Sequence, residues 1–143
     1  MTQCIAAVAR AAHEPFTIET LSVTSPGPGE VLVQIAGVGV CHTDLVFRDQ
    51  MDAFMKPAVL GHEGAGTVEA VGEGVTGLAP GDSVVIGFSS CGGCKQCADH
   101  LPSYCQSFVP LNYAGMRLED GSTAYTAEGE RVSSHFFGQS SFA

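Results

Sequence analysis

Residues 91–105 read CGGCKQCADHLPSYC, and this stretch holds four of the six cysteines of the chain. The cysteines follow the spacing C-x2-C-x2-C-x7-C, at Cys91, Cys94, Cys97 and Cys105. Gaps of two residues let tight turns aim successive sulfurs at one point, and Gly92 and Gly93 supply the backbone freedom for such turns. Four thiolates are the ligand set of a closed, tetrahedral zinc site without an open position for chemistry. The stretch therefore predicts a structural Zn2+ lobe.

The four cysteines have three alternative uses: disulfides, an iron–sulfur cluster or a thiol redox sensor. Disulfides form in oxidising compartments, but residues 1–16 contain no apolar segment with a cleavage site, so we expect no signal peptide and a reducing cytoplasm. A ferredoxin-type cluster has its fourth cysteine close by and before a proline, whereas Cys105 follows a gap of seven residues and precedes Gln106. A thiol redox sensor is the third possibility, and loss of the fold on adding a chelator would oppose it.

The composition is that of a globular chain with one domain. The 143 residues suffice for a single core, 45% of them are hydrophobic and 15% are charged. With six Lys and Arg and a net charge of −9, few side chains are available to contact phosphates, so we exclude a nucleic-acid surface. No segment approaches the run of about 20 apolar residues that a membrane span requires, and we expect none.

Short apolar segments with an alternating pattern, separated by turns rich in Gly and Pro, predict a mostly β fold. The expected strands cover residues 4–9, 16–23, 31–40, 67–71, 83–86, 124–127 and 130–136. One or two helical turns are expected up to about Asp49, a loop over 50–58 and an irregular section over 106–121. No long helical period occurs, so we predict a barrel or sandwich of short strands.

Residues 72–77, GEGVTG, match the G-x-G-x-x-G pattern of dinucleotide-binding loops. That pattern binds a dinucleotide where it opens a helix inside a βαβ unit. Here Pro80-Gly81 follows within three residues of Gly77, and another expected strand begins shortly after. We therefore interpret 72–77 as a turn between strands.

Two polar clusters outside the lobe contain possible metal ligands. Residues 41–44 read CHTD at the end of an expected strand, and residues 61–64 read GHEG. A catalytic zinc takes three protein ligands and keeps a fourth position for water or substrate. Cys41 and His62 would provide two ligands, and no unassigned cysteine downstream provides the third. A cysteine and a histidine so far apart are more often unrelated, so the pair alone leaves the question open.

Four segments together carry a resemblance to a known family. They are GVGVCHTD (37–44), LGHEGAGTVEAVG (60–72), PGDSVV (80–85) and the four-cysteine lobe, in this order and spacing. Over essentially its whole length, the chain resembles the GroES-like N-terminal catalytic domain of zinc-dependent medium-chain alcohol dehydrogenases. Residues 110–124 and 134–143 are similar to the aryl-alcohol (benzyl-alcohol) dehydrogenase branch. The resemblance implies a GroES-like, partly open barrel over residues 1–143, with few short helices and a zinc-binding lobe at 91–105.

The resemblance also implies ligands for two zinc ions. Cys41 and His62 match the ligands of the catalytic zinc, and Glu63 matches an acidic neighbour that approaches the metal. Asp44 matches the carboxylate that orients the ligand histidine through its other ring nitrogen. The lobe cysteines match the ligands of the structural zinc: Cys91, Cys94, Cys97 and Cys105.

Three further positions match residues around the reacting alcohol. Thr43 matches the hydroxyl that hydrogen-bonds the substrate oxygen and passes its proton on, and His42 matches a position beside the cofactor pyrophosphate. Phe88 falls near an aromatic residue of the substrate pocket. Many relatives carry a relay histidine four residues after the position of His42, where this chain has Val46. The proton would therefore leave through His42, water or the cofactor ribose.

The activity implied by the resemblance is the oxidation of aromatic primary alcohols to aldehydes with NAD or NADP. In the family, the Rossmann cofactor domain and a third ligand cysteine lie beyond the segment that these 143 residues match. We therefore expect the 143-residue chain to be inactive by itself, and the full-length form to be a homo-oligomer. The alternative is a zinc-stabilised binding module that performs no catalysis.

The remaining candidates are expected to be structural. The other histidines and the tyrosines are interpreted as surface or packing residues: His13, His100, His135, Tyr104, Tyr113 and Tyr125. Cys4, in an apolar strand, is interpreted as a small core residue. Phe136 and Phe137 are expected to expose an apolar patch, because a full-length relative would cover them.

Overall fold

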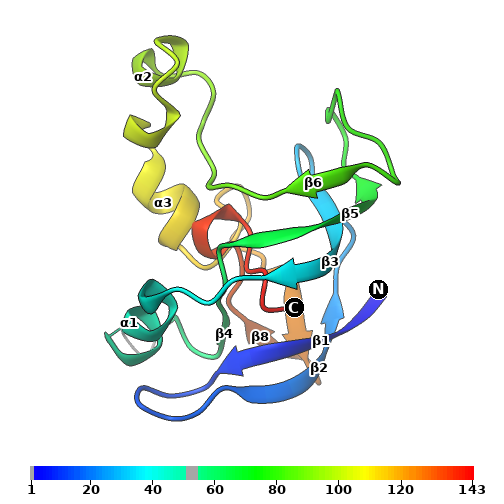
Figure 1. The fold of residues 1–143 in the computed structure, drawn as a ribbon, viewed down its shortest axis with the longest axis vertical. Coiled ribbons are helices and arrows are strands. Elements are labelled where there is room, and N and C mark those ends of the chain that lie inside the picture. The colour runs from blue at the N-terminus through cyan, green and yellow to red at the C-terminus, as the bar shows by residue number, and fades with distance from the viewer. Residues whose placement is uncertain (1, 51–54) are drawn as a thin grey trace.

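Two antiparallel sheets form the body of the structure, a computed structural model that describes residues 2–50 and 55–143 (Figure 1). The strands of the larger sheet are β1 (Thr2–Ala9), β2 (Thr17–Val23), β4 (Ala58–Val59), β7 (Tyr125–Ala127) and β8 (Glu130–Val132). Those of the smaller sheet are β3 (Val31–Val38), β5 (Gly64–Val71) and β6 (Ser83–Val85). The strand order is β4-β1-β2-β7-β8 in the larger sheet and β3-β5-β6 in the smaller one.

The core lies on the inner face of the larger sheet. Along β1, Ala6 and Val8 are buried, whereas Ile5, one residue out of phase, is 71% exposed. This alternation follows from the period of two in a strand. Val8 packs in one cluster with Leu21 of β2 and Val132 of β8, which are both fully buried. Each such side chain contributes about 1.5–3 kcal/mol through burial.

The helical elements lie together on one side of the sheets (Figure 1). They are α1 (His42–Gln50), α2 (Lys95–Ala98), η2 (Pro102–Tyr104), α3 (Phe108–Tyr113) and η3 (Phe136–Gly138). The lobe 91–105 contains α2 and η2 and extends away from the sheets, and α3 leads the chain back from it. Within residues 2–50 and 55–143, no helix is long and apolar enough to cross a membrane.

The predicted fold class, mostly β with few short helices, is confirmed. The turn predicted at 72–77 is also confirmed, because the connection from β5 to β6 contains no helix. β5 begins at Gly64 instead of residue 67, since pairing with β3 extends the strand through glycines that have little β propensity of their own. Of the predicted loop 50–58, residues 51–54 lie outside the described residues, and Ala58 belongs to β4.

Two predictions in the C-terminal part are wrong. The section 106–121, expected to be irregular, contains α3. The strand expected over 130–136 ends at Val132, and η3 follows. His135 and Phe137 have φ angles of 62° and 49°, which a strand does not allow. An apolar run by itself does not distinguish a strand from a buried turn.

The predicted apolar patch at the C-terminal end is wrong for Phe136. This side chain is 3% exposed and packs in a core cluster with Ala9, Ala58 and Leu60. Its ring also contacts the Phe47 ring of α1 edge-on, with 4.8 Å between centroids. The left-handed backbone at the start of η3 turns Phe136 inward, which no local sequence pattern indicates.

Candidate metal and catalytic sites

The pairing of β3 with β5 brings the two predicted ligand segments together. Val38 at the end of β3 lies opposite Gly64 at the start of β5. Cys41 follows β3, and His62 and Glu63 precede β5, so antiparallel pairing places all three at one end of the sheet. The Cys41 sulfur, a His62 ring nitrogen and a Glu63 carboxylate oxygen lie within 4.8 Å of one another. This spacing suits three donors around one metal ion.

Asp44 holds both segments in this arrangement. Its side chain is fully buried, and Oδ2 accepts a hydrogen bond from the Cys41 N–H (3.0 Å), as in a capping box at the start of α1. Oδ1 accepts from the Gly61 N–H at 3.1 Å and faces His62 Nδ1 at 3.0 Å. With Nδ1–H donating to Asp44, His62 Nε2 keeps the lone pair that a metal requires. One buried carboxylate therefore positions both predicted ligands.

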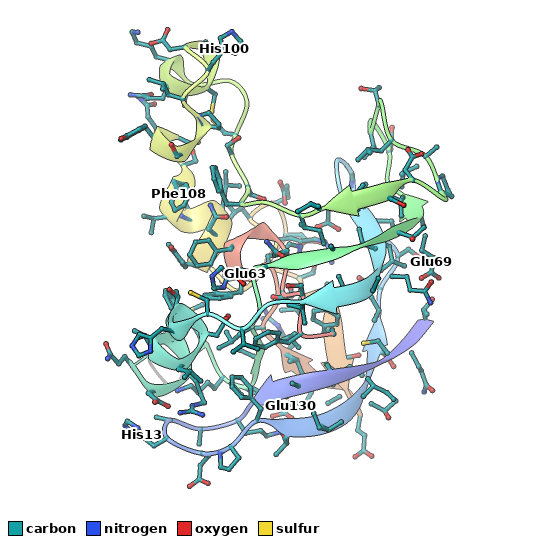
Figure 2. All side chains as sticks on the ribbon, in the orientation of Figure 1. His13, Glu63, Glu69, His100, Phe108 and Glu130 are labelled. Atoms are coloured by element: carbon teal, nitrogen blue, oxygen red, sulfur yellow. The ribbon has the colours of Figure 1, made fainter. Side chains whose placement is uncertain are left out.

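Two glycines make room around His62 and Glu63. Figure 2 shows Glu63 at the start of β5, in the region between α1 and α3. An added Cβ at Gly39 would collide with the Glu63 carboxylate, so the glycine is required for this placement. Gly61 has a φ of 86°, and an added Cβ there would collide with Phe142. Close contacts therefore explain the glycines at positions 39 and 61.

Thr43 and His42 occupy the first turn of α1. Thr43 Oγ1 lies 3.5 Å from Cys41 Sγ, within hydrogen-bonding distance for sulfur. His42 is the first residue of α1 and is exposed. Unpaired N–H groups at a helix N-terminus attract anions, which fits the predicted position beside a pyrophosphate. The structure places both residues next to Cys41, and their catalytic roles stay predictions.

Aromatic rings border the His62 side chain. The Phe137 ring stacks on the imidazole, with 4.6 Å between centroids and 25° between planes. Tyr113 of α3 contacts Phe137 edge-on at 5.1 Å. Phe88, which is 41% exposed, packs on Phe108 with 5.4 Å between centroids. The metal-ligand cluster is thus next to apolar, ring-shaped surfaces.

The four cysteines of the lobe converge as their spacing predicts. Their sulfurs all lie within 4.8 Å of one another. Cys94 Sγ is 3.6 Å from Cys97 Sγ and 4.0 Å from Cys105 Sγ. A tetrahedral ion with Zn–S bonds of about 2.3 Å separates its sulfurs by roughly 3.8 Å. The donor set and its spacing therefore fit zinc.

Backbone N–H groups donate hydrogen bonds to cysteine sulfurs of the lobe. The Ser107 N–H donates to Cys105 Sγ at 3.4 Å. The backbone N–H of Gln106 is the main cause that lowers the pKa of the Cys94 thiol to about 6. Desolvation instead raises the pKa of Cys97 to about 11, so metal binding there must release a proton. Such N–H···S bonds support the thiolate form that binds zinc.

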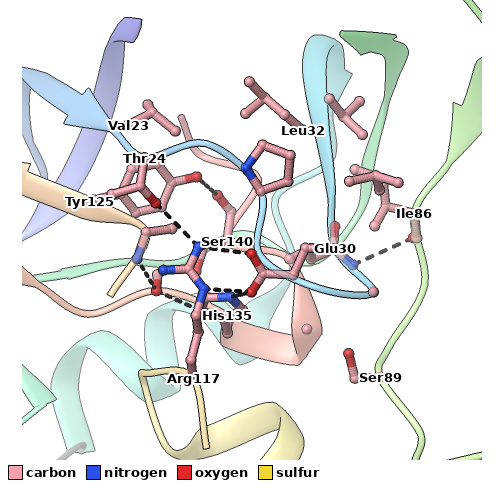
Figure 3. Close-up of a pocket in the computed structure, with 18 of the residues that line it drawn as sticks. Val23, Thr24, Glu30, Leu32, Ile86, Ser89, Arg117, Tyr125, His135 and Ser140 are labelled. Atoms are coloured by element: carbon pink, nitrogen blue, oxygen red, sulfur yellow. Dashed lines mark hydrogen bonds and ion pairs between the residues drawn. The ribbon is translucent and has the colours of Figure 1, made fainter. Parts of the chain in front are cut away.

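A cavity of about 400 Å³ lies between the two sheets, and neither Cys41 nor His62 lines it (Figure 3). On its wall, Glu30 accepts two hydrogen bonds from Arg117, both at 2.8 Å. His135 Nε2 lies 2.9 Å from Glu30 Oε1. Burial acts to raise the pKa of Glu30, but these partners hold it well below its ordinary value. Because the charges compensate each other, we assign this network a structural role.

The sequence did not indicate the network around Glu30. Glu30 and His135 are 105 positions apart, and no spacing rule relates them. His13 and His100 belong to neither group of possible metal ligands. The His13 N–H donates to Asp49 at 3.0 Å, and Figure 2 shows His100 at the far end of the lobe. Cys4 is partly buried against the main core, and burial raises the pKa of its thiol.

The chain matches known proteins over most of its length. The sequence profile of the alcohol dehydrogenase GroES-like domain matches residues 27–136. Geraniol dehydrogenase from Castellaniella defragrans is 53% identical over 137 residues, which cover 96% of this chain and 36% of that protein. Alcohol dehydrogenase class-3 from Caenorhabditis elegans is 43% identical over 142 residues, which cover 98% of this chain and 36% of that protein.

Two solved structures share the fold. The alcohol dehydrogenase zinc-binding domain protein from Burkholderia ambifaria superposes with a TM-score of 0.93 at 51% identity, covering 99% of this chain and 38% of that one. Benzyl alcohol dehydrogenase from Acinetobacter calcoaceticus gives a TM-score of 0.88 at 42% identity, with the same coverage. The chain thus spans little more than a third of the length of these relatives. It belongs to the family of alcohol dehydrogenase GroES-like domains, of the zinc-dependent medium-chain type.

Proposed function

We propose that the chain is the N-terminal catalytic domain of a zinc-dependent alcohol dehydrogenase that oxidises aromatic primary alcohols to aldehydes with NAD. One observation carries the proposal: the donor atoms of Cys41, His62 and Glu63 lie within 4.8 Å of one another, with Asp44 buried behind them. A purely structural domain has no reason to assemble this cluster in addition to a complete four-cysteine site.

When bound, zinc supplies a Lewis acid for the alcohol oxygen, and the nicotinamide cofactor accepts the hydride. The residues of this chain hold the metal, orient the histidine ligand and move a proton. Cys41 and His62 hold the metal, with Glu63 within reach, and Asp44 fixes the imidazole through Nδ1. Thr43 Oγ1 accepts the proton of the substrate hydroxyl and passes its own proton on to His42, water or the cofactor ribose.

The substrate class rests on the surroundings of the metal ligands. Phe137 stacks on His62, and Phe88 and Phe108 form a second aromatic pair of which Phe88 is 41% exposed. Such surfaces favour a planar, apolar substituent on the alcohol. The relatives named for benzyl alcohol and geraniol support a ring or an alkene next to the hydroxyl-bearing carbon.

We propose that the part of the enzyme beyond these 143 residues binds the cofactor and supplies the third ligand cysteine. The described residues contain no βαβ unit. We therefore propose that the 143-residue polypeptide does not form NADH from alcohols by itself. Robust alcohol-dependent NADH formation by this polypeptide contradicts that proposal. We further propose that the full-length enzyme is cytoplasmic and homo-oligomeric.

Metal titration tests the proposed catalytic site. The metal-free chain is titrated with Co2+, and cobalt–thiolate absorption is followed for the wild type and for Cys41→Ala. We expect a tight first equivalent at the four-cysteine lobe and a weaker second equivalent that Cys41→Ala abolishes. A wild type that binds only one equivalent would mean that Cys41, His62 and Glu63 form an incomplete site in this chain without the third ligand cysteine. A second equivalent that Cys41→Ala leaves unchanged contradicts the metal site and favours the alternative of a zinc-stabilised module without catalysis.

A further inference from the structure

The segment 135–140 has an unusual backbone where it approaches His62. Four of its residues have left-handed φ angles between 49° and 70°: His135, Phe137, Gly138 and Ser140. Three of these are not glycine, and residues of this kind persist in left-handed conformations only where the surrounding structure holds them. Residues with such strained backbone cluster at functional sites.

Gln139, within this segment, binds the backbone on both sides of Glu63. Its Nε2 donates to the His62 carbonyl at 2.9 Å, and its Oε1 accepts from the Gly64 N–H at 3.1 Å. Nε2 also lies 3.4 Å from the carbonyl oxygen of Ile86, the first residue after β6. A single side-chain amide thus links the ligand segment to the segment that leaves β6.

Neighbouring contacts hold Gln139 against the ligand segment. The Ser141 N–H donates to the Gly61 carbonyl at 3.0 Å, so the two backbones run side by side. An added Cβ at Gly64 would lie 2.6 Å from Ser141 Cβ and 3.2 Å from Gln139 Oε1, which shows how closely they pack. Within the same segment, Phe137 stacks on the His62 ring.

Gln139 and Asp44 hold different parts of the same residue. Asp44 hydrogen-bonds His62 at Nδ1 and the Gly61 N–H, which fixes the ring and the start of the segment. Gln139 fixes the His62 carbonyl and the Gly64 N–H, which set the direction of the backbone through Glu63. The ring nitrogen that faces the metal is positioned only if both the ring torsions and the backbone are held.

We propose that Gln139 is a positioning residue for the metal site, acting through the backbone of His62 and Glu63. The inference rests on the proposed function, in which Cys41 and His62 bind a metal. Gln139 contacts neither substrate nor metal in this role. Its loss leaves the donor atoms present but less well placed, and such supporting contacts typically contribute 10–100-fold to metal affinity.

The test uses Co2+ binding to the 143-residue chain, with the first and second equivalents resolved by titration and by their absorption spectra. Gln139→Met keeps an unbranched side chain of similar length and removes the hydrogen bonds to His62 and Gly64. Gln139→Glu keeps an acceptor for the Gly64 N–H and serves as a second variant if the first does not fold. Ser140→Ala is the matched control, because Ser140 is equally part of the left-handed segment, and its hydroxyl bonds Val59 and Phe136 but not the ligand segment.

We expect Gln139→Met to raise the dissociation constant of the second equivalent 10–100-fold and to shift its d–d absorption bands. The first equivalent, at the lobe, stays unchanged, and Gln139→Glu gives a smaller effect. Ser140→Ala lowers thermal stability without changing either spectrum. If Gln139→Met and Ser140→Ala bind the second equivalent equally well, the inference is overturned while the proposed function stands. If the wild type itself binds no second equivalent, the inference is overturned for this chain, because Gln139 then has no metal site to position, whereas the proposed function fails only if Cys41→Ala leaves a second equivalent unchanged.

Discussion

Nδ1 of His62 lies 3.0 Å from Oδ1 of Asp44, a carboxylate with no exposed surface. The same carboxylate accepts the backbone N–H groups of Cys41 and Gly61. Asp44 therefore connects the start of α1 to the turn before β5, and it does so at the point where the two predicted zinc ligands meet. Both oxygens of this buried carboxylate accept backbone hydrogen bonds, which offsets the cost of burying them.

Replacing Asp44 with Asn is expected to weaken the second metal site and the fold together. The amide accepts fewer hydrogen bonds and leaves a buried N–H unpaired, which costs about 1–3 kcal/mol of unfolding free energy. Because Asn keeps only one acceptor oxygen, its NH2 group must face either the Cys41 N–H or the His62 ring, and we expect a 10–100-fold weaker second equivalent of Co2+. Urea unfolding and metal titration measure the two effects. Asp99→Asn, on the exposed surface of the lobe, should change neither quantity.

Removing zinc is expected to disorder the lobe and spare the sheets. Of the four lobe cysteines only Cys105 is buried, and Leu101 and Tyr104 are 49% and 72% exposed, so the lobe has little core of its own. A metal ion must therefore supply its stability. Amide hydrogen exchange after treatment with a chelator should show loss of protection in the lobe and continued protection in β1 and β2. A lobe that stays protected without metal, with its cysteines oxidised in pairs, would support the redox-sensor alternative.

Stability is expected to fall in acid through Glu30. Burial opposes ionisation, but His135 and Arg117 hold the folded-state pKa of Glu30 well below the ordinary value of 4.5. A lowered carboxyl pKa stabilises the fold fully above about pH 4.5, and this stabilisation is lost as the pH falls towards the folded-state pKa. Urea unfolding between pH 7 and pH 3 should show a smaller dependence on pH for Glu30→Gln than for the wild type. Glu14→Gln, at an exposed position, should follow the wild-type curve.

Truncating Phe136 is expected to destabilise the chain strongly. The side chain is 3% exposed and packs with Leu60 and Phe47, so Phe136→Ala leaves a cavity and should cost about 3–5 kcal/mol. Thermal unfolding measures this loss. Phe88→Ala is the comparison, because Phe88 is 41% exposed and should cost much less. Equal losses for both variants would contradict the assignment of Phe136 to the core.

The sequence alone determined the features that depend on short separations along the chain. Four cysteines within 91–105 reach one point through local turns, so their spacing was enough to predict the cluster. Alternation over a few residues was enough to predict most strands and the turn at 72–77. Hydrogen bonding and side-chain reach over such distances need no knowledge of the rest of the fold.

Only the tertiary structure decided the features that join distant segments. Cys41 and His62 meet because β3 and β5 pair with Val38 opposite Gly64, after two shifts of register along the strands. The contacts of Gln139 with His62 and of Glu30 with His135 span 77 and 105 positions. The inward turn of Phe136 depends on left-handed backbone that only the surrounding packing stabilises. These arrangements follow from sheet register and burial, which no local pattern encodes.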